Sequence, residues 1–138
     1  MFGNSSFGRT TDILHRTMDV NMLRQSVIAD NIANVDTPNF KRSEINFETS
    51  LRQALESEKY EPFPQRLTHD RHIPFHRPMD YRDVRPRRNL DFTTSTKNNG
   101  NNVDIEIESM NLLNSQLAYQ MMTENLSSQF RQVNIVLR

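Results

Sequence analysis

The chain has 138 residues, and only 35% of them are hydrophobic, so a large core is not expected. Seventeen basic residues balance seventeen acidic ones, which argues against nucleic acid or an anionic membrane as a partner attracted by the net charge of the chain. The chain has no cysteine, which excludes disulfides and thiolate zinc sites.

The first nine residues are predicted to form a mobile arm. They hold two of the three glycines and few side chains that could anchor them. They lack the apolar run and the cleavage pattern of a secretory signal, and no stretch elsewhere approaches the roughly 20 apolar residues that span a bilayer. If the protein leaves the cytoplasm, we therefore expect a route without a cleaved signal peptide.

An amphipathic helix is predicted over residues 12–33. Thr10, Thr11 and Asp12 are residue types that cap helix N-termini. From there apolar side chains recur with helical spacing, and most charged side chains fall outside their stripe. The residues expected to pack against another helix are Leu14, Met18, Ile28 and Ile32.

Residues 29–40 are predicted to end this helix. Asn34 tolerates the left-handed conformation used just past a helix end, and Pro38 cannot continue a helix. The short side chains of Asp36 and Thr37 can bond the backbone groups that such an ending leaves unpaired. The chain is expected to leave the helix here and to turn.

The middle of the chain is predicted to hold a short helix, over residues 47–60, and then a long irregular segment, residues 61–102. Proline at the density of this segment excludes both long helices and central strands. About 40 residues without regular structure also argue against one compact domain. The prolines concerned are Pro62, Pro64, Pro74, Pro78 and Pro86.

A second amphipathic helix is predicted over residues 104–137, with Asp104 as its cap. Apolar residues recur there every seven positions from Ile105 onward, and others join them on the same side. A further apolar stripe follows the first half only and consists of Met110, Leu113, Leu117 and Met121. The residues expected to pack are Ile105, Leu112, Leu117, Tyr119, Met122, Leu126, Phe130 and Val133.

These patterns predict a mainly α protein whose long N- and C-terminal amphipathic helices pack as a coiled-coil-like pair, with a long irregular proline-rich middle segment. Residues 1–45 contain the arm, the first helix and its stop, residues 46–101 the short helix and the irregular excursion, and residues 102–138 the last helix. The two terminal helices form one core domain.

One antiparallel pair of helices leaves the second apolar stripe bare. We therefore expect partners, copies of the chain or close relatives, and we expect the subunit to order fully when it binds them. A solitary three-helix domain with a floppy loop is the alternative.

Two clusters in the middle segment are candidates for binding. Imidazoles with the spacing of His69, His72 and His76 can meet at a metal, but a proline lies among them and no cysteine supports the site, so we predict no metal. The basic cluster is interrupted by acidic residues, so a solvated or subunit-contacting loop is favoured over phosphate binding. The cluster consists of Arg82, Arg85, Arg87 and Arg88.

No enzyme is predicted. The chain has no glycine-rich phosphate loop, no nucleophile elbow and no paired-carboxylate motif. We therefore expect no catalytic residues, no cofactor, no small-molecule substrate and no nucleic acid. The remaining classes of function are a structural polymer subunit and a binding module, either a generic helical adaptor or a metal-binding loop.

The run of residues 31–42 (NIANVDTPNFKR), preceded by an amphipathic helix, resembles the N-terminal motif of the bacterial flagellar basal-body rod protein family. Residues 44–47 (EINF), 100–106 (GNNVDIE) and 116–120 (QLAYQ) are similar to its proximal rod subunits. The resemblance covers about residues 10–60 and 98–138 and leaves the proline-rich middle unmatched. Another rod subunit type, or a non-flagellar helical adaptor, is the alternative.

The resemblance implies a structural subunit of the proximal rod, which polymerises with itself and other rod proteins into the drive shaft for motility. It further implies export through the flagellar type III apparatus, a place in the periplasm, and contact at the rod base with the adaptor to the membrane ring. The helix stop would then also aim the following segment at a neighbouring subunit. The residues of this assembly motif are Asn31, Ala33, Asn34, Asp36, Thr37, Pro38 and Phe40.

Overall fold

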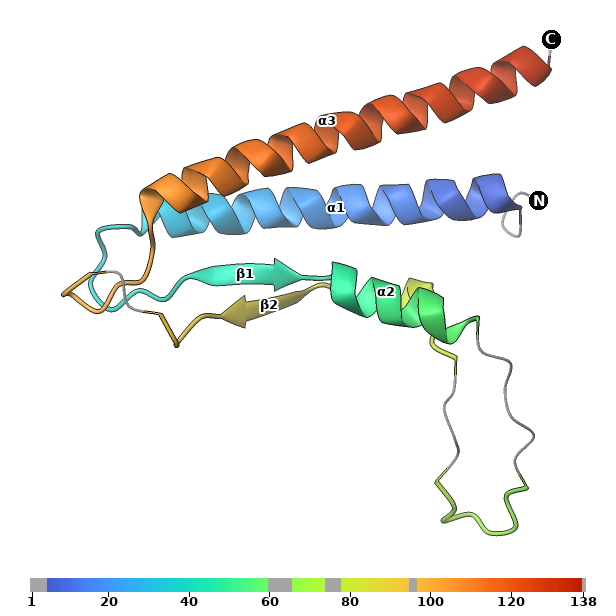
Figure 1. Ribbon diagram of the computed structural model, residues 1–138, viewed down its shortest axis with the longest axis horizontal. Helices are drawn as coiled ribbons and strands as arrows, with labels where there is room; N and C mark the ends of the chain where they lie inside the picture. The colour runs from blue at the N-terminus through green and yellow to red at the C-terminus, as the bar shows by residue number, and fades with distance from the viewer. Residues whose placement is uncertain (1–4, 60–65, 74–77, 95–96, 138) are drawn as a thin grey trace. The chain divides into compact units, whose positions relative to one another are not determined.

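The computed structural model describes residues 5–59, 66–73, 78–94 and 97–137, and it is mainly helical, as predicted (Figure 1). The elements are α1 (Ser6–Ala33), β1 (Ser43–Asn46), α2 (Glu48–Ser57), the short 3₁₀ helix η1 (Tyr81–Asp83), β2 (Arg87–Leu90) and α3 (Ile105–Val136). They form two compact units, Met1–Ile45 with Arg88–Arg138, and Asn46–Arg87. None of the helices, over the residues described, is long and apolar enough to cross a membrane.

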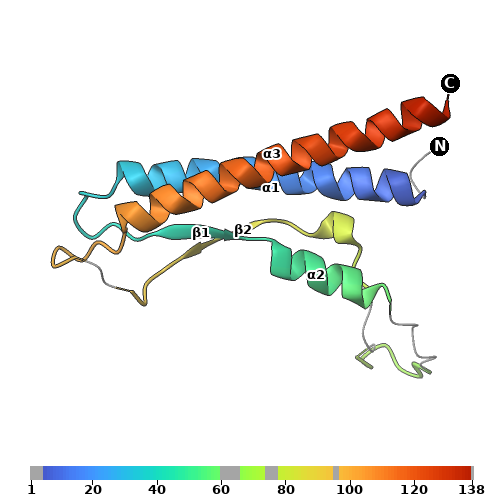
Figure 2. The ribbon, with the colours of Figure 1, turned by 45° about the horizontal axis from the view of Figure 1, so that its top comes forward.

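The first unit is built on α1 and α3, which lie side by side and run in opposite directions (Figures 1 and 2). Val20, Val27 and Ile28 of α1 are buried. Near the start of α1 and the end of α3, the rings of Phe7 and Phe130 meet edge to face, with centroids 5.8 Å apart. The long terminal helices are thus confirmed, whereas their coiled-coil-like packing stays a prediction.

The first helix begins six residues earlier than predicted, at Ser6 instead of residue 12. The side chain of Ser5 accepts a hydrogen bond from the backbone N–H of Gly8, at 3.1 Å, and caps the helix in place of Thr10, Thr11 or Asp12. The mobile arm is therefore wrong for residues 6–9, while residues 1–4 lie outside the described part. The aromatic contact of Phe7 adds a reason for the early start, because it holds this first turn against α3.

The start of α3 agrees with the sequence. Asp104 is its N-cap, and its Oδ1 accepts from the backbone N–H groups of Glu106, at 2.9 Å, and Ile107, at 3.4 Å. The helix runs from Ile105 to Val136, within one residue of the prediction at each end. A side-chain cap and a sustained apolar repeat are local signals, which explains the agreement.

The two strands were not predicted. β1 and β2 form a two-stranded sheet and run in opposite directions (Figure 1). In β1 burial alternates from residue to residue, but the first inward side chain is that of a serine, Ser43, so hydrophobicity does not mark the strand. The irregular segment predicted over residues 61–102 is therefore wrong at η1 and β2. Pro86 directly precedes β2, a position that a strand tolerates.

The second unit contains α2 and η1, and the predicted short helix over residues 47–60 is confirmed as Glu48–Ser57. Its buried side chains include those of Phe47, Ala54, Tyr81 and Val84. The hydroxyl of Ser57 donates to the carbonyl of Ala54, at 2.7 Å, and accepts from the backbone N–H of Met79, at 2.9 Å. This hydroxyl ties the end of α2 to the segment that leads into η1.

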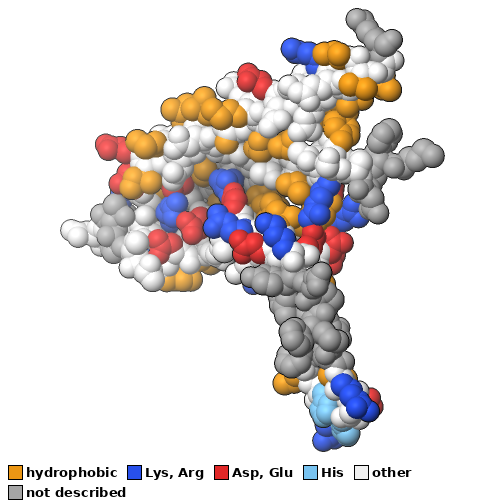
Figure 3. Space-filling model, turned by 45° about the vertical axis from the view of Figure 1, so that its right-hand side comes forward, with side chains coloured by type: hydrophobic (Ala, Val, Ile, Leu, Met, Phe, Trp, Pro, Cys, Tyr) orange, Lys and Arg blue, Asp and Glu red, His pale blue; other side chains and the backbone are white. Residues whose placement is uncertain are grey.

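The residues predicted to pack in the helical pair differ in exposure. Ile28 is buried, and Leu14, Met18, Ile32, Leu112, Tyr119, Met122, Leu126 and Val133 are half-buried. Ile105, Leu117 and Phe130 are 49%, 45% and 49% exposed. The second stripe, Met110, Leu113, Leu117 and Met121, lies at the surface, and Figure 3 shows hydrophobic side chains on the surface of this part of the molecule. A packing role for these residues stays a prediction.

Loss of the Asp104 cap should destabilise α3. We expect Asp104→Ala to lower the free energy of unfolding by about 1 kcal/mol, because two backbone N–H groups lose their acceptor. Asp104→Asn keeps an acceptor at the same position and should remain close to wild type. Urea unfolding followed by circular dichroism measures both, and equal losses in the two variants would contradict the assignment.

Candidate functional site

The helix stop is held by the side chains of asparagines. Asn34 is the C-cap of α1, and its side-chain amide donates to the carbonyl of Asp30, at 2.8 Å. Its φ of −103° is not left-handed, so the predicted conformation of Asn34 is wrong. The left-handed residue is Asn39, with a φ of 59°. The left-handed conformation therefore lies five residues later than expected.

The carbonyls of this turn are bound by Asn101, which is fully buried. Its Nδ2 donates to the backbone oxygens of Asn34, Val35 and Thr37, at 2.9, 3.0 and 2.8 Å. Its Oδ1 accepts from the backbone N–H of Val103, at 2.7 Å. One side chain from just before α3 thus binds three backbone carbonyls of the turn that follows α1.

Residues 97–101 close against the same turn. The ammonium group of Lys97 donates to the carbonyl of Val35, at 2.9 Å, and that of Lys41 to the carbonyl of Gly100, at 2.7 Å. The backbone N–H of Asn39 donates to the carbonyl of Asn99, at 3.1 Å. The segment before α3 is therefore fixed to the segment after α1 by contacts in both directions.

Asn31 joins α1 to β1 and to α3. It is fully buried, and its Oδ1 accepts from the backbone N–H of Ser43, at 3.1 Å. Its Nδ2 donates to the carbonyl of Ser43, at 2.8 Å, and to Oε2 of Glu108, at 2.9 Å. The amide pairs with both backbone groups of one strand residue, and so acts as a substitute for a neighbouring strand.

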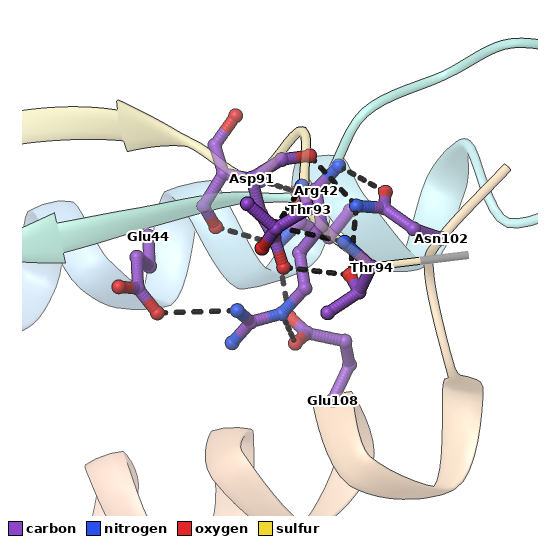
Figure 4. Close-up of polar contacts among 9 residues, drawn as sticks. Arg42, Glu44, Asp91, Thr93, Thr94, Asn102 and Glu108 are labelled. Atoms are coloured by element: carbon purple, nitrogen blue, oxygen red, sulfur yellow. Dashed lines mark hydrogen bonds and ion pairs between the residues drawn. The ribbon is translucent and has the colours of Figure 1, made fainter. Parts of the chain in front are cut away.

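The carboxylate of Glu108 is the one buried acidic group among the described residues, with 1% of its surface exposed. Its Oε1 accepts from Nε of Arg42, at 2.7 Å, while Arg42 also reaches Oε2 of Glu44, at 3.1 Å (Figure 4). Burial alone would lower the pKa of the Arg42 guanidinium. The hydrogen bonds and the attraction to Glu108 and Glu44 outweigh this effect, and the pKa is raised. Each oxygen of the buried carboxylate therefore has its own donor.

Asn102 extends this junction to the loop after β2. Its Oδ1 accepts from the backbone N–H of Arg42, at 2.7 Å, and its Nδ2 donates to the carbonyl of Asp91, at 2.8 Å (Figure 4). The side-chain hydroxyl of Thr94 and then the backbone N–H and hydroxyl of Thr93 donate to the carboxylate of Asp91, and these bonds hold its pKa well below the usual range. We call residues 31–42, 91–94 and 97–108 together the polar junction.

The predicted assembly motif lies partly inside this junction and partly at its surface. Asn31 is buried, while Asp36, Thr37 and Pro38 are exposed and Phe40 is half-buried. The side chains of Asp36 and Thr37 contact Lys97 and Asn34, at 3.4 and 3.3 Å. Ala33 is the last residue of α1. Whether these residues contact a neighbour stays a prediction.

Sequence reasoning missed Lys97, Asn101, Asn102, Arg42 and Glu108. Their partners lie dozens of positions away, so no local pattern marks the contacts. The one available signal was compositional. Two adjacent asparagines, Asn101 and Asn102, precede a capped helix, and asparagine side chains can bond backbone groups.

Several side chains of the junction bond backbone groups of other segments. Within the described ranges, no three His, Cys, Asp or Glu side chains are grouped so that they could hold a metal ion. The rings of His69 and His72 lie 5.9 Å apart, and His76 falls outside the described residues.

In the basic cluster, Arg88 lies 4.0 Å from Asp30, and the guanidinium of Arg82 lies over the ring of Tyr81. Beside the junction, a groove of about 300 Å³ is lined by side chains of α1, β1 and α3.

Comparison with known proteins identifies relatives over nearly the whole chain. Residues 16–41, which end in the helix stop, match the family described as flagella basal body rod protein. The chain is 45% identical to the flagellar basal body rod protein FlgB of Borreliella burgdorferi, over 97% of this chain and 99% of that one. It is also 45% identical to that of Borrelia hermsii, over 96% and 98%, and 33% identical to that of Bacillus subtilis, over 96% of each.

Removal of the charge on Glu108 should weaken the whole junction. We expect Glu108→Gln to lower the free energy of unfolding by about 1 to 3 kcal/mol, because Arg42 loses a charged partner and an added amide must be accommodated without water. The exposed Glu124→Gln on the same helix is the matched control and should change it by less than about 0.5 kcal/mol. Equal effects in urea unfolding would contradict a buried, paired carboxylate.

The carboxyl of Asp91 should titrate at unusually low pH. Because its pKa is depressed in the fold, its contribution to stability is present above the ordinary carboxyl range and is lost as the pH falls toward the folded pKa. Thr94→Val removes the first of its hydrogen bonds and should return the pKa toward the usual range. NMR titration of the side-chain carbon measures this, with the urea-unfolded chain as reference, and an unchanged pKa in the variant would refute the cause.

Proposed function

Because the chain belongs to the FlgB family of flagellar basal body rod proteins, we propose that it polymerises with copies of itself and other rod proteins through the surfaces that its helical pair leaves exposed. It is a structural subunit of the proximal rod of the bacterial flagellar basal body and serves motility as a building element, not as an enzyme. Association with other rod proteins follows from the same membership.

The observation that carries the proposed mode of assembly is the bare apolar stripe on α3. Met110 and Met121 are 65% and 69% exposed, and Leu113 and Leu117 between them are 56% and 45% exposed. A side chain of this size gains about 1.5 to 3 kcal/mol when it is fully buried, so such a stripe favours contact with a neighbour. Methionine at both ends suits it to partners of slightly different shape.

The polar junction supplies the rigidity that this role requires. The buried side chains of Asn31, Asn101 and Glu108 tie the end of α1, the strand β1 and the first turns of α3 together. The turn at Asp36, Thr37 and Pro38 is exposed at its surface, where a neighbouring subunit could reach it. In this proposal the motif ends the helix and presents the turn to the next subunit.

The finer placement in the basal body is also part of the proposal. The subunit would lie at the rod base in the periplasm, beside the adaptor to the membrane ring, and would arrive through the flagellar export apparatus without cleavage of a signal peptide. Family membership supports this placement. Its helices would then transmit torque as part of the drive shaft.

Substitution in the motif should block assembly. We expect Pro38→Gly or Phe40→Ala to leave the subunit soluble and exported but unable to join the rod, because the first frees the backbone of the turn and the second removes the aromatic side chain that follows it. Swimming in soft agar and the yield of rods from cells that lack the wild-type gene measure this. Glu124→Gln, exposed on α3, is the control. Circular dichroism must show helices in each variant, and normal swimming and rod yield with either motif variant would end the claim.

A further inference from the structure

Asn99 and Gly100 form a chemically labile pair inside the polar junction. An asparagine followed by glycine is prone to lose its side-chain amide, because glycine has no side chain to hinder attack by its backbone nitrogen. Asn99 is exposed, so water reaches its side chain. We propose that Asn99 is a site of spontaneous deamidation, and that the rate depends on whether residues 97–101 are closed against the helix stop.

The reaction needs no reagent other than water. The backbone nitrogen of Gly100 gives its proton to water or hydroxide and attacks Cγ of Asn99, so that an N–Cγ bond forms. The Cγ–Nδ2 bond then breaks, and ammonia leaves with a proton from solvent. Water opens the resulting succinimide at one carbonyl or the other. The product is aspartate or isoaspartate at position 99.

The closed loop opposes this attack by holding each reacting group. The N–H of Gly100 donates to the carbonyl of Lys97, at 3.2 Å, and the carbonyl of Asn99 accepts from Asn39, at 3.1 Å, so both sides of the peptide that must rotate are engaged. Oδ1 of Asn99 accepts from the backbone N–H of Asn101, at 3.1 Å, which fixes the side chain. Ring closure therefore requires the loop to open first.

The fold also explains why position 100 holds glycine and not a larger residue that would slow the reaction. Gly100 has a φ of 78°, which disfavours any side chain, and an added Cβ would lie 2.7 Å from Oδ1 of Asn39. The glycine is thus required by the closed loop. The same closed loop then restrains the reacting atoms of the asparagine that the glycine makes labile.

Conversion of Asn99 to isoaspartate would prevent the loop from closing again. Isoaspartate adds a methylene to the backbone between residues 99 and 100, so the bonds from Asn39 to Asn99 and from Gly100 to Lys97 can no longer both form. Asn101, next along the chain, would lose its place against the helix stop. If the proposed mode of assembly is correct, subunits damaged in this way would not enter the rod.

The test is peptide mass spectrometry of the full-length chain after incubation at neutral pH, in native buffer and in urea. The native sample is kept at a concentration at which circular dichroism shows the helices formed. We expect conversion at Asn99 in urea, slowed by about tenfold or more in the native chain, because reaction requires local opening. Equal rates at Asn99 in the two samples, or no conversion there in urea, would overturn the proposal.

A variant separates loop opening from general unfolding. Lys41→Met removes the ammonium group that binds the carbonyl of Gly100 but leaves the reacting atoms unchanged. We expect it to speed native deamidation at Asn99 severalfold while the circular dichroism spectrum is retained. Lys59→Met, exposed in the other unit, is the control and should keep the wild-type rate. Equal native rates in the two variants would also refute control by the loop. Because these readouts use the isolated chain, they do not depend on rod assembly.

Discussion

The buried carboxylate of Glu108 is the constraint on which the rest of the first unit depends. A charge removed from water is tolerated only when it is paired and hydrogen-bonded, and Arg42 and Asn31 meet that need at one oxygen each. Asn31 belongs to α1, Arg42 immediately precedes β1, and Glu108 lies in the first turns of α3. The cost of leaving the charge unpaired therefore keeps three separate elements in one arrangement.

In this junction, asparagine side chains bond the backbone N–H and C=O groups that helices and sheets pair elsewhere. Asn31 pairs with both backbone groups of Ser43, Asn101 binds three carbonyls of the helix stop, and Asn102 bridges two further segments. An amide has donors and an acceptor in fixed positions, so it can replace a peptide group. This explains how a chain with few apolar residues holds a defined turn without a larger core.

The sequence predicted those features that rest on local patterns. The long helices follow from apolar periodicity, and Asp104 is recognisable as a cap because the residue type and the following run are adjacent. Ser5 was missed because Gly8 and the arm-like composition hid a helix start that its cap and Phe7 stabilise. The sheet was missed because the inward residue Ser43 is polar and is buried for its backbone contacts. The contacts of Asn101 and Glu108 are long-range and leave no periodic trace.

The bonds from Asn101 to the helix stop connect residues 64 to 67 positions apart. Contacts of such high sequence separation form late, because a long loop must close before any of them can be made. A chain that is only partly synthesised, or partly through a narrow channel, lacks one side of each contact. The turn after α1 can therefore make all of its hydrogen bonds only when the segment before α3 is also present.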